Sequence, residues 1–261
     1  MDIKRKLYFT LPPILVLIIF LLVWSGFSNF IYADMAFLLP SPLIVVQSFI
    51  SNFGDIFDAA MMTLSEALSG FLLAISIGIT SAAIMSQSKL LERSFYPYAI
   101  LLQTVPVVAV APLIVLWFGF DERSVIIISL IISLFPIINN TLLGLKSTSI
   151  NLVELFQMHN SSRFVNFFKL RLPAATPHII AGMRISAGLS VIGAIVGEFI
   201  IGSGNSNGGL GVQVIYAQGR LETALLFALI LTATLVGFLF FITVSTLGHQ
   251  LLRHWHESEI A

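Results

Sequence analysis

The chain has 261 residues, of which 57% are hydrophobic and only 10% are charged, and its mean hydropathy is +0.98. Soluble domains carry about 25% charged residues, and a soluble core of this size could not bury so many apolar side chains. The composition therefore predicts an all-α polytopic membrane protein with a single domain. A net charge of zero gives no electrostatic basis for binding nucleic acid, and the lack of cysteine excludes disulfides, thiolate metal sites and cysteine nucleophiles.

Hydrophobic runs separated by charged or turn residues predict six transmembrane helices, because about 20 apolar residues are needed to cross a bilayer. The expected spans cover residues 11–31, 63–85, 96–118, 124–145, 175–201 and 223–247. The first run is longer than the apolar core of a signal peptide, so we expect it to be retained as a helix. Between the first two spans, Pro40 and Pro42 indicate a turn, and residues 43–53 have the spacing of an amphipathic helix lying along the membrane interface.

Lysine and arginine predict the orientation, because cytoplasmic segments carry the excess of these residues. With a cytoplasmic N-terminus, the outer segments hold only Arg123 and Arg220. The cytoplasmic segments then hold ten basic residues, namely Lys4, Arg5, Lys6, Lys89, Arg93, Lys146, Arg163, Lys169, Arg171 and Arg253. Both termini are therefore predicted to lie in the cytoplasm, together with the chain between the fourth and fifth spans.

The longest polar interruption lies within residues 149–173, which we call the connecting segment. Apolar residues at helical spacing predict a short helix over 151–158 and a second over 162–170, with a turn at 160–162 that offers good N-cap residues. Pro173 marks the start of the fifth span. Leucine and phenylalanine give both helices an apolar face in the cytoplasm, which indicates a partner protein. A helix lying on the lipid surface would present the same face.

Three charged residues within the predicted spans point to a functional interior. Glu66, Arg184 and Glu198 would each cost at least ~2.5–3.5 kcal/mol if exposed to lipid at mid-membrane, so they face either a pathway or structural partners. Arg184 and Glu198 are separated by roughly 21 Å along one helix and cannot pair. A stand-alone secondary transporter could use these three residues for ion coupling. Prolines in the third and fourth spans, among them Pro106 and Pro136, predict kinks.

Enzymatic chemistry is not indicated. A nucleotide-binding P-loop requires a lysine after its second glycine, and Leu210 follows Gly209 where that lysine would stand. The histidines and carboxylates do not cluster as metal ligands. No histidine lies well inside a span to act as the base of an intramembrane serine hydrolase. We therefore expect neither a catalytic residue nor a bound cofactor or metal.

The spacing of the connecting segment resembles the EAA loop of ABC importer permeases. Glu154 is followed six residues later by Asn160 and then by Leu170-Arg171-Leu172-Pro173, which matches the spacing in that family. Leu155 and Phe156 stand where the family has two alanines, and Asn160 replaces its glycine. Asparagine is the next best residue for a left-handed turn, so a sharp turn there is still expected.

Motifs along most of the chain are similar to the nitrate, sulfonate and taurine branch of these permeases. That branch includes permeases for thiamine-precursor pyrimidines and, by similarity, riboflavin. The motifs are Leu39-Pro40-Ser41-Pro42, the run from Gln103 to Gly119, Phe135-Pro136, Leu172-Pro173-Ala174-Ala175, Gly182-Met183-Arg184, Gly197-Glu198-Phe199 and Gly209-Leu210-Gly211. Taken in this order and spacing, they are specific for the family.

The resemblance implies a type I ABC importer, or MetI-like, fold in the bacterial inner membrane. It implies a pathway between two copies of the chain, two separate ATPase subunits that hold ATP and Mg, and a periplasmic or lipid-anchored substrate-binding protein. The residues expected to couple to the ATPase are Glu154, Leu155, Phe156, His159, Asn160, Ser161, Arg163, Phe164, Leu172 and Pro173. Those expected along the translocation pathway are Glu66, Gln103, Pro106, Arg184 and Glu198.

The outer segments favour a substrate other than a simple anion. Against Arg123 and Arg220 they carry six acidic residues, namely Asp34, Asp55, Asp58, Asp121, Glu122 and Glu222. This balance offers no funnel for an anion such as nitrate. We expect a small organic solute, within the sulfonate, taurine, pyrimidine and riboflavin range of the branch.

Overall fold

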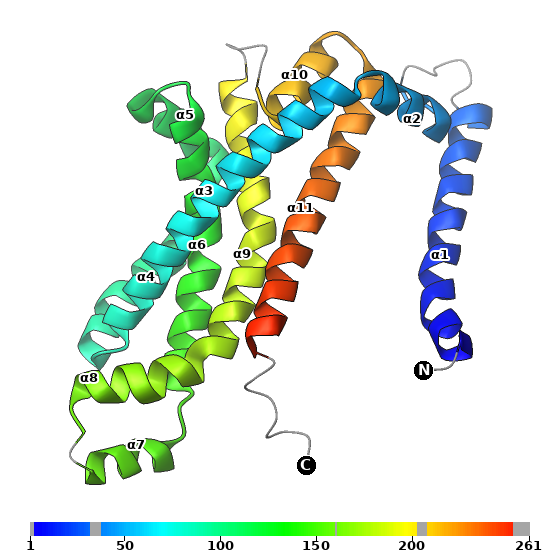
Figure 1. The fold of residues 1–261 in the computed structure, drawn as a ribbon. Helices are drawn as coiled ribbons and strands as arrows, with labels where there is room; N and C mark the ends of the chain where they lie inside the picture. The colour runs from blue at the N-terminus through cyan, green and yellow to red at the C-terminus, as the bar shows by residue number, and fades with distance from the viewer. Residues whose placement is uncertain (1–2, 32–37, 160, 203–207, 253–261) are drawn as a thin grey trace.

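A computed structural model describes residues 3–31, 38–159, 161–202 and 208–252 (Figure 1). Asp34, Asn160 and Arg253, which the sequence analysis singled out, and residues 203–207 lie outside this described part. Over the described residues the chain is helical and contains no strand, which confirms the predicted all-α class. Five helices are long and apolar enough to cross a membrane, or six if one bent pair counts as a single span.

The spanning helices follow the hydrophobic runs. They are α1 (Ile3–Gly26), α3 (Phe53–Met85), the bent pair α4 (Lys89–Thr104) and α5 (Val107–Phe118), α6 (Glu122–Lys146), α9 (Leu172–Ile201) and α11 (Thr223–Leu252). Shorter elements are the π-helix η1 (Phe27–Ile31), α2 (Pro42–Ser51), α7 (Ile150–Met158), α8 (Arg163–Asn166), the π-helix η3 (Phe167–Arg171) and α10 (Leu210–Gly219). We call the end of the bundle beside α7 and α8 the loop end, and the end beside α2 and α10 the far end.

The predicted span over residues 96–118 is not one helix. It is divided into α4 and α5, which meet at an angle of 99°, and α4 already begins at Lys89. Val105 and Pro106 both have extended backbone angles at the break. Proline disfavours the helical conformation of the residue before it and has no N–H to donate to the preceding turn, so the helix ends there.

The predicted span over residues 63–85 is also longer than expected, because α3 begins at Phe53. Ile56, Ala59 and Ala60 are buried and continue the apolar face that Ala67 carries further along the helix. This spacing of three and four residues is the helical pattern of a buried face. Asp55 and Asp58 lie on the exposed side and do not interrupt the helix.

The centre of the bundle is formed by α3, α6 and α9, which approach closely through small residues. A Cβ atom on Gly193 of α9 would lie 2.7 Å from the Cα atom of Ser129 on α6. Hydroxyl groups also bridge these two helices, since Ser129 donates to the carbonyl of Ser190 at 2.9 Å and Ser186 donates to that of Ser133 at 2.6 Å. Small residues and hydroxyl hydrogen bonds are the usual means of helix association in membranes. We therefore treat α3, α6 and α9 as the rigid core.

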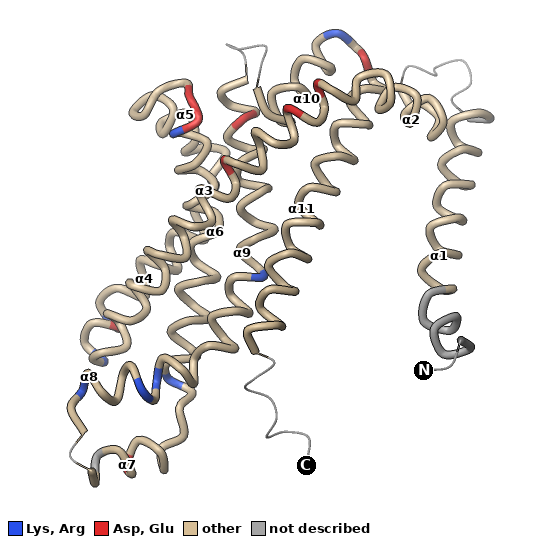
Figure 2. The backbone as a smooth tube through the Cα atoms, in the orientation of Figure 1, with Lys and Arg blue, Asp and Glu red and all other residues tan. Residues whose placement is uncertain are grey.

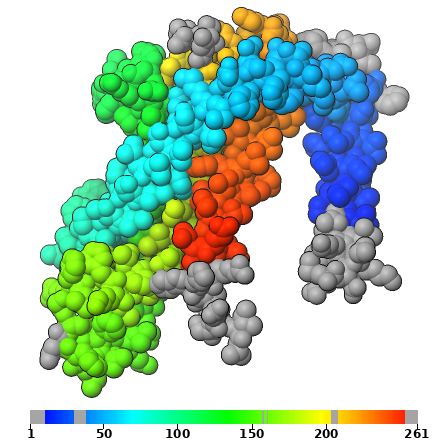
Figure 3. Space-filling model, viewed as in Figure 1, coloured from blue at the N-terminus to red at the C-terminus, as the bar shows by residue number. Residues whose placement is uncertain are grey.

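By contrast, α1 stands apart from this core (Figures 1 and 3). Only 6% of its most apolar window is buried. It is held at the far end, where the Trp24 indole donates a 3.1 Å hydrogen bond to the carbonyl of Pro40 and packs its ring 5.7 Å from that of Phe227 on α11. Its exposed leucine, isoleucine and valine side chains suit contact with lipid or with another protein.

Candidate functional site

The first half of the connecting segment, α7, projects beyond the loop end (Figure 1), and the non-helical residues 147–149 join it to α6. None of its described side chains is buried, and Leu155 and Met158 are 48% and 81% exposed. Glu154, on the same helix, is exposed and has no hydrogen-bond partner among the described residues. An isolated helix of nine residues is marginal in water, so α7 presents a surface that a partner would stabilise.

Polar side chains define the turn that follows α7. A ring nitrogen of His159 lies 2.9 Å from the carbonyl oxygen of Leu155, and the Ser161 hydroxyl donates a 2.7 Å hydrogen bond to the carbonyl of Phe156. These contacts satisfy carbonyl groups at the end of the helix. The Ser162 hydroxyl then accepts from the Val165 backbone N–H and caps α8. The predicted turn therefore contains a cap at each side, while Asn160 itself is not described.

The second half of the connecting segment runs into the membrane helix without a break. From Arg163 to Ile201, α8, η3 and α9 form one continuous candidate span. The expected division at Pro173 is absent, and the π-helix η3 stands just before this proline. A proline clashes with the carbonyl four residues earlier, and the wider π-turn is a common local adjustment within a helix. A displacement of α8 is thus passed directly to α9.

Phenylalanine side chains cover the surface of α8 and η3. The rings of Phe164 and Phe168 lie 4.4 Å apart, and the Phe164 side chain is 71% exposed. Together with Arg163 and Phe167 they border a groove of about 410 Å³ whose other wall is the loop end of α3, at Ala83 and Ile84, and the turn after it, at Gln87. The connecting segment therefore offers aromatic side chains both to a partner and to α3.

At the far end, a group of buried polar atoms joins three helices, and we call it the carboxyl junction (Thr63, Glu66, Glu198, Leu210 and Gly211). One carboxylate oxygen of Glu198 accepts a 2.7 Å hydrogen bond from the Thr63 hydroxyl, and the other accepts a 2.6 Å bond from the Gly211 N–H. The Leu210 N–H donates to the Thr63 hydroxyl at 2.8 Å. Glu198 and Thr63 thus satisfy N–H groups at the start of α10, where a negative charge is favourable.

Within this junction Glu66 lies beside Glu198, and sequence reasoning did not predict that these two residues are neighbours. Glu66 and Glu198 are 3% and 1% exposed and both line a cavity of about 210 Å³ at the far end. Asp121 and Glu122 also line this cavity, and among the described residues no lysine or arginine does. One carboxyl oxygen of Glu66 is buried without a hydrogen-bond partner. The cavity is therefore acidic, in agreement with the acidic outer segments in the sequence.

Glycine is required where α10 meets Glu198. A Cβ atom on Gly211 would lie 2.6 Å from the carbonyl oxygen of Ile195 and 2.8 Å from the Cβ of Glu198. A Cβ atom on Gly209 would overlap the Glu198 carboxylate. Real Cβ atoms do not approach backbone this closely, because the packed interior tolerates little overlap. These contacts give a steric reason for both glycines of the Gly209-Leu210-Gly211 motif.

The other residues expected along a pathway lie elsewhere. Arg184 is half-buried between α9 and α11, where it donates a long 3.4 Å hydrogen bond to the carbonyl of Ser245. Gln103 and Pro106 are exposed at the break between α4 and α5. The structure therefore brings together Glu66 and Glu198 but places Arg184 and the α4–α5 break at separate sites. In the described part of the chain, no three His, Cys, Asp or Glu side chains are arranged to hold a metal ion.

Comparison with known proteins identifies a family. A family model described as "Binding-protein-dependent transport system inner membrane component" matches residues 74–255, which include most of the core and the whole connecting segment. The chain is 33% identical to the formylaminopyrimidine transport permease protein ThiX of Halalkalibacterium halodurans over 249 residues, covering 95% of this chain and 97% of the relative.

Two further relatives are named for other solutes. The chain is 32% identical to the riboflavin transport system permease protein RibX of Chloroflexus aurantiacus, covering 85% of this chain and 82% of the relative. It is 30% identical to the putative aliphatic sulfonates transport permease protein SsuC of Bacillus subtilis, covering 97% and 91%. These similarities confirm the family resemblance found in the connecting segment and in the motifs along the chain.

Proposed function

Because this chain belongs to the family of binding-protein-dependent transport inner membrane components, and is therefore an ABC permease for a small solute, we propose that its connecting segment docks an ATPase subunit. Two copies of the chain would enclose the pathway, two ATPase subunits would bind ATP and Mg, and a binding protein would deliver substrate to the far end. The chain itself would hold no nucleotide.

The observation that carries this proposal is the exposure of α7 and α8. Leu155, Met158 and Phe164 are 48%, 81% and 71% exposed, and they lie on α7 and α8 at the loop end. Apolar side chains on these projecting helices do not contact the bundle core. If the segment lies outside the bilayer, they do not contact lipid either. Interfaces are rich in buried aromatic anchors surrounded by polar residues, and Glu154, Arg163 and Lys169 surround this surface.

Charge supports a cytoplasmic position for the loop end. Figure 2 shows basic residues gathered along α8 and η3, at Arg163, Lys169 and Arg171, whereas most of the acidic residues lie at the far end. Basic residues are retained on the cytoplasmic side of membrane proteins. In this orientation the ATPase would meet the connecting segment in the cytoplasm, and both termini would lie on that side.

The continuity of α8, η3 and α9 supplies a mechanism. Closure of an ATPase dimer around ATP would displace α7 and α8, and α9 would move with them as one helix. The close contact of α9 with α6 at Gly193 and Ser129 would carry α6 along. Such rigid-body movement of packed helices is a standard form of switching, and it would alternate access to the pathway between the two membrane faces.

The substrate we propose is a small organic solute that is not a simple inorganic anion. The relatives are named for a formylaminopyrimidine, riboflavin and aliphatic sulfonates. In the described part of this chain, the far-end cavity is lined by Glu66, Asp121, Glu122 and Glu198 and by no basic residue. A negative cavity repels anions and favours neutral or amino-bearing solutes.

Reconstitution in vesicles tests the proposal. The chain with an ATPase subunit and the binding protein encoded beside it should take up solute only with ATP, and the chain alone should take up none. Glu154→Lys should abolish ATPase co-purification, whereas the matched variant Glu222→Lys, which reverses an exposed far-end charge, should not. Uptake driven by an ion gradient with the chain alone would instead establish a secondary transporter, and full ATPase binding by Glu154→Lys would exclude this docking surface.

A further inference from the structure

Helix α4 is attached to the bundle along one side only. Ala99 is its single buried residue, while Leu90 and Tyr98 are 76% and 66% exposed. Its buried side packs on α3 and α6 through a small apolar cluster that includes Met85 and Leu142. The core helices α6 and α9, in contrast, are closed on each other by glycines and interhelical hydrogen bonds. Helix α4 is therefore able to move relative to the core unless specific contacts hold it.

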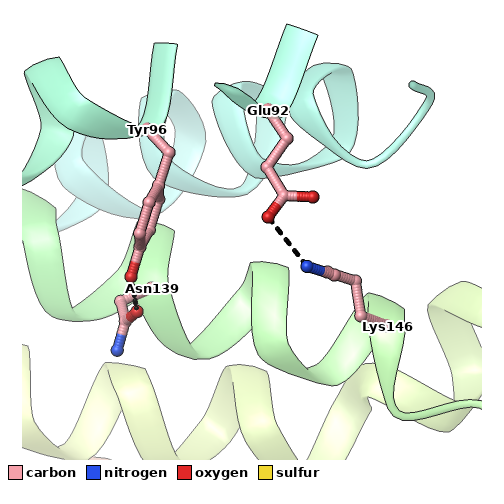
Figure 4. Close-up of polar contacts among 4 residues, drawn as sticks. All are labelled: Glu92, Tyr96, Asn139 and Lys146. Atoms are coloured by element: carbon pink, nitrogen blue, oxygen red, sulfur yellow. Dashed lines mark hydrogen bonds and ion pairs between the residues drawn. The ribbon is translucent and has the colours of Figure 1, made fainter. Parts of the chain in front are cut away.

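Two polar contacts hold α4 on α6 (Figure 4). The Lys146 ammonium group lies 2.7 Å from a carboxylate oxygen of Glu92, and the Tyr96 hydroxyl donates a 2.8 Å hydrogen bond to the side-chain oxygen of Asn139. Glu92 and Tyr96 are one turn apart on α4, whereas Asn139 and Lys146 are about two turns apart on α6. Because the two helices run in opposite directions, the contacts follow one line and define the register of α4 on α6.

The position of Lys146 connects this line to the connecting segment. Lys146 is the last residue of α6, directly before the chain leaves for α7. Its contact with Glu92 is the one ion pair formed within the described residues. The beginning of α4 is thus tied to the point where the connecting segment leaves the core.

The opposite end of α4 is the 99° break at Val105 and Pro106. Beyond the break, α5 is packed on α6 and α9 by Ala111 and Ile114, which are 0% and 3% exposed. Helix α4 is therefore bounded by a hinge-like break at one end and by the Glu92–Lys146 pair at the other. Hinges are commonly a few residues at the end of an element that absorb a change in backbone angle.

We propose that Glu92–Lys146 and Tyr96–Asn139 are positioning contacts that keep α4 on the loop end of α6, so that α4 moves with α6 and does not turn about the Val105–Pro106 break when the connecting segment is displaced. This inference rests on the proposed docking of an ATPase. Half-exposed ion pairs add little to the stability of a folded protein. We therefore expect the Glu92–Lys146 pair to position α4 on α6 and to contribute little to the free energy of folding.

Because the chain has no cysteine, spin labels can be attached at pairs of introduced cysteines to measure the position of α4. Spin labels on exposed positions would report two distances by pulsed EPR: Leu90→Cys with Leu143→Cys between α4 and α6, and Leu90→Cys with Leu116→Cys across the break. Labelled chain diluted with unlabelled chain would be assembled with the ATPase and compared without nucleotide and after trapping with ATP and vanadate. We expect trapping to leave both distances unchanged, because the two polar contacts hold α4 on α6 and buried apolar side chains pack α5 on α6.

Charge variants identify the contact that is responsible. Lys146→Glu combined with Tyr96→Phe should broaden the α4–α6 distance distribution and make the distance across the break change on trapping. The double exchange Glu92→Lys with Lys146→Glu, made with Tyr96 intact, should restore both. Lys89→Glu makes the same charge change on an exposed lysine of α4 that has no ion-pair partner within the described residues, and it should behave as the unmodified chain.

Two results would overturn the inference: unchanged distances in the Lys146→Glu, Tyr96→Phe variant, or failure of the charge exchange to restore them. A nucleotide-dependent α4–α6 distance in the unmodified chain would also contradict it, because α4 would then move independently of α6. Failure of the unmodified chain to bind any ATPase would overturn the proposed function itself, and that outcome is visible before a distance is measured.

Discussion

Thr63 and Glu198 are 135 positions apart in the chain, yet the hydroxyl of Thr63 donates a 2.7 Å hydrogen bond to the carboxylate of Glu198. The same hydroxyl accepts from the N–H of Leu210, so three helices meet at one buried oxygen atom. This relationship holds α10 on the far end of α3 and α9. In an importer, α10 would then follow the movement of α9 without a hinge of its own.

Thr63→Val should destabilise the far end. Valine has a similar volume but leaves the Leu210 N–H without its acceptor and Glu198 with one donor fewer. A buried polar group without a partner costs about 1–3 kcal/mol, and we expect the midpoint of thermal unfolding in detergent to fall accordingly. Thr80→Val is the matched control, because Thr80 is exposed on the same helix and donates only within it. Equal midpoints for the two variants would mean that the carboxyl junction does not stabilise the protein.

Gly193→Ala should weaken the contact between α6 and α9. The added methyl group would lie 2.7 Å from the Cα atom of Ser129, which forces the helices apart, and overpacking of this kind costs about 1–3 kcal/mol. Gly188→Ala lies on the same helix and meets nothing within 4 Å, so it should be neutral or slightly stabilising. The half-life of the folded chain under limited proteolysis measures the difference. A longer or equal half-life for Gly193→Ala would contradict the close packing of the core.

Ser186→Ala should remove a stabilising hydrogen bond between the same two helices. Its hydroxyl is buried and donates to the carbonyl of Ser133 at 2.6 Å. Interhelical hydrogen bonds in membranes contribute about 0.6–2 kcal/mol, so unfolding should begin at a lower mole fraction of SDS. Ser69→Ala removes a hydroxyl that donates only within α3 and should leave the SDS titration unchanged. Coincident titrations for the two variants would show that the Ser186 bond makes no net contribution.

Phe164→Ser should weaken the binding of the ATPase subunit. Aromatic side chains at the centre of an interface often contribute most of the binding energy, and the loss of about 1.4 kcal/mol would raise the dissociation constant roughly tenfold. Phe120→Ser is a matched control, because Phe120 is equally exposed, at 71%, but lies at the far end. Binding of purified ATPase to the immobilised chain measures both. Similar losses for the two variants would place the interface elsewhere.

The transmembrane helices and the connecting segment could be predicted, because apolar runs and turn residues are signals carried by neighbouring residues in the sequence. The buried face of α3 at Ile56, Ala59 and Ala60 also had such a signal, but Asp55 and Asp58 obscured it because they alternate with the buried positions. The sequence signal for the contact of Glu92 with Lys146 was weaker: both residues lie near the same end of neighbouring antiparallel helices. Residues at the same depth in the membrane can be neighbours, but depth alone does not identify which two side chains are in contact.

The sequence by itself determined that the chain crosses a membrane several times, that a polar segment with an apolar face divides it, and to which family it belongs. Hydropathy, turn residues and motif spacing depend only on neighbours along the chain, so these conclusions did not need coordinates. Only the tertiary structure decided that Glu66 lies beside Glu198, that α4 and α5 meet at 99°, and that Lys146 secures α4. Each of these depends on side chains brought together from distant parts of the chain, and a proline permits a bend without setting its angle.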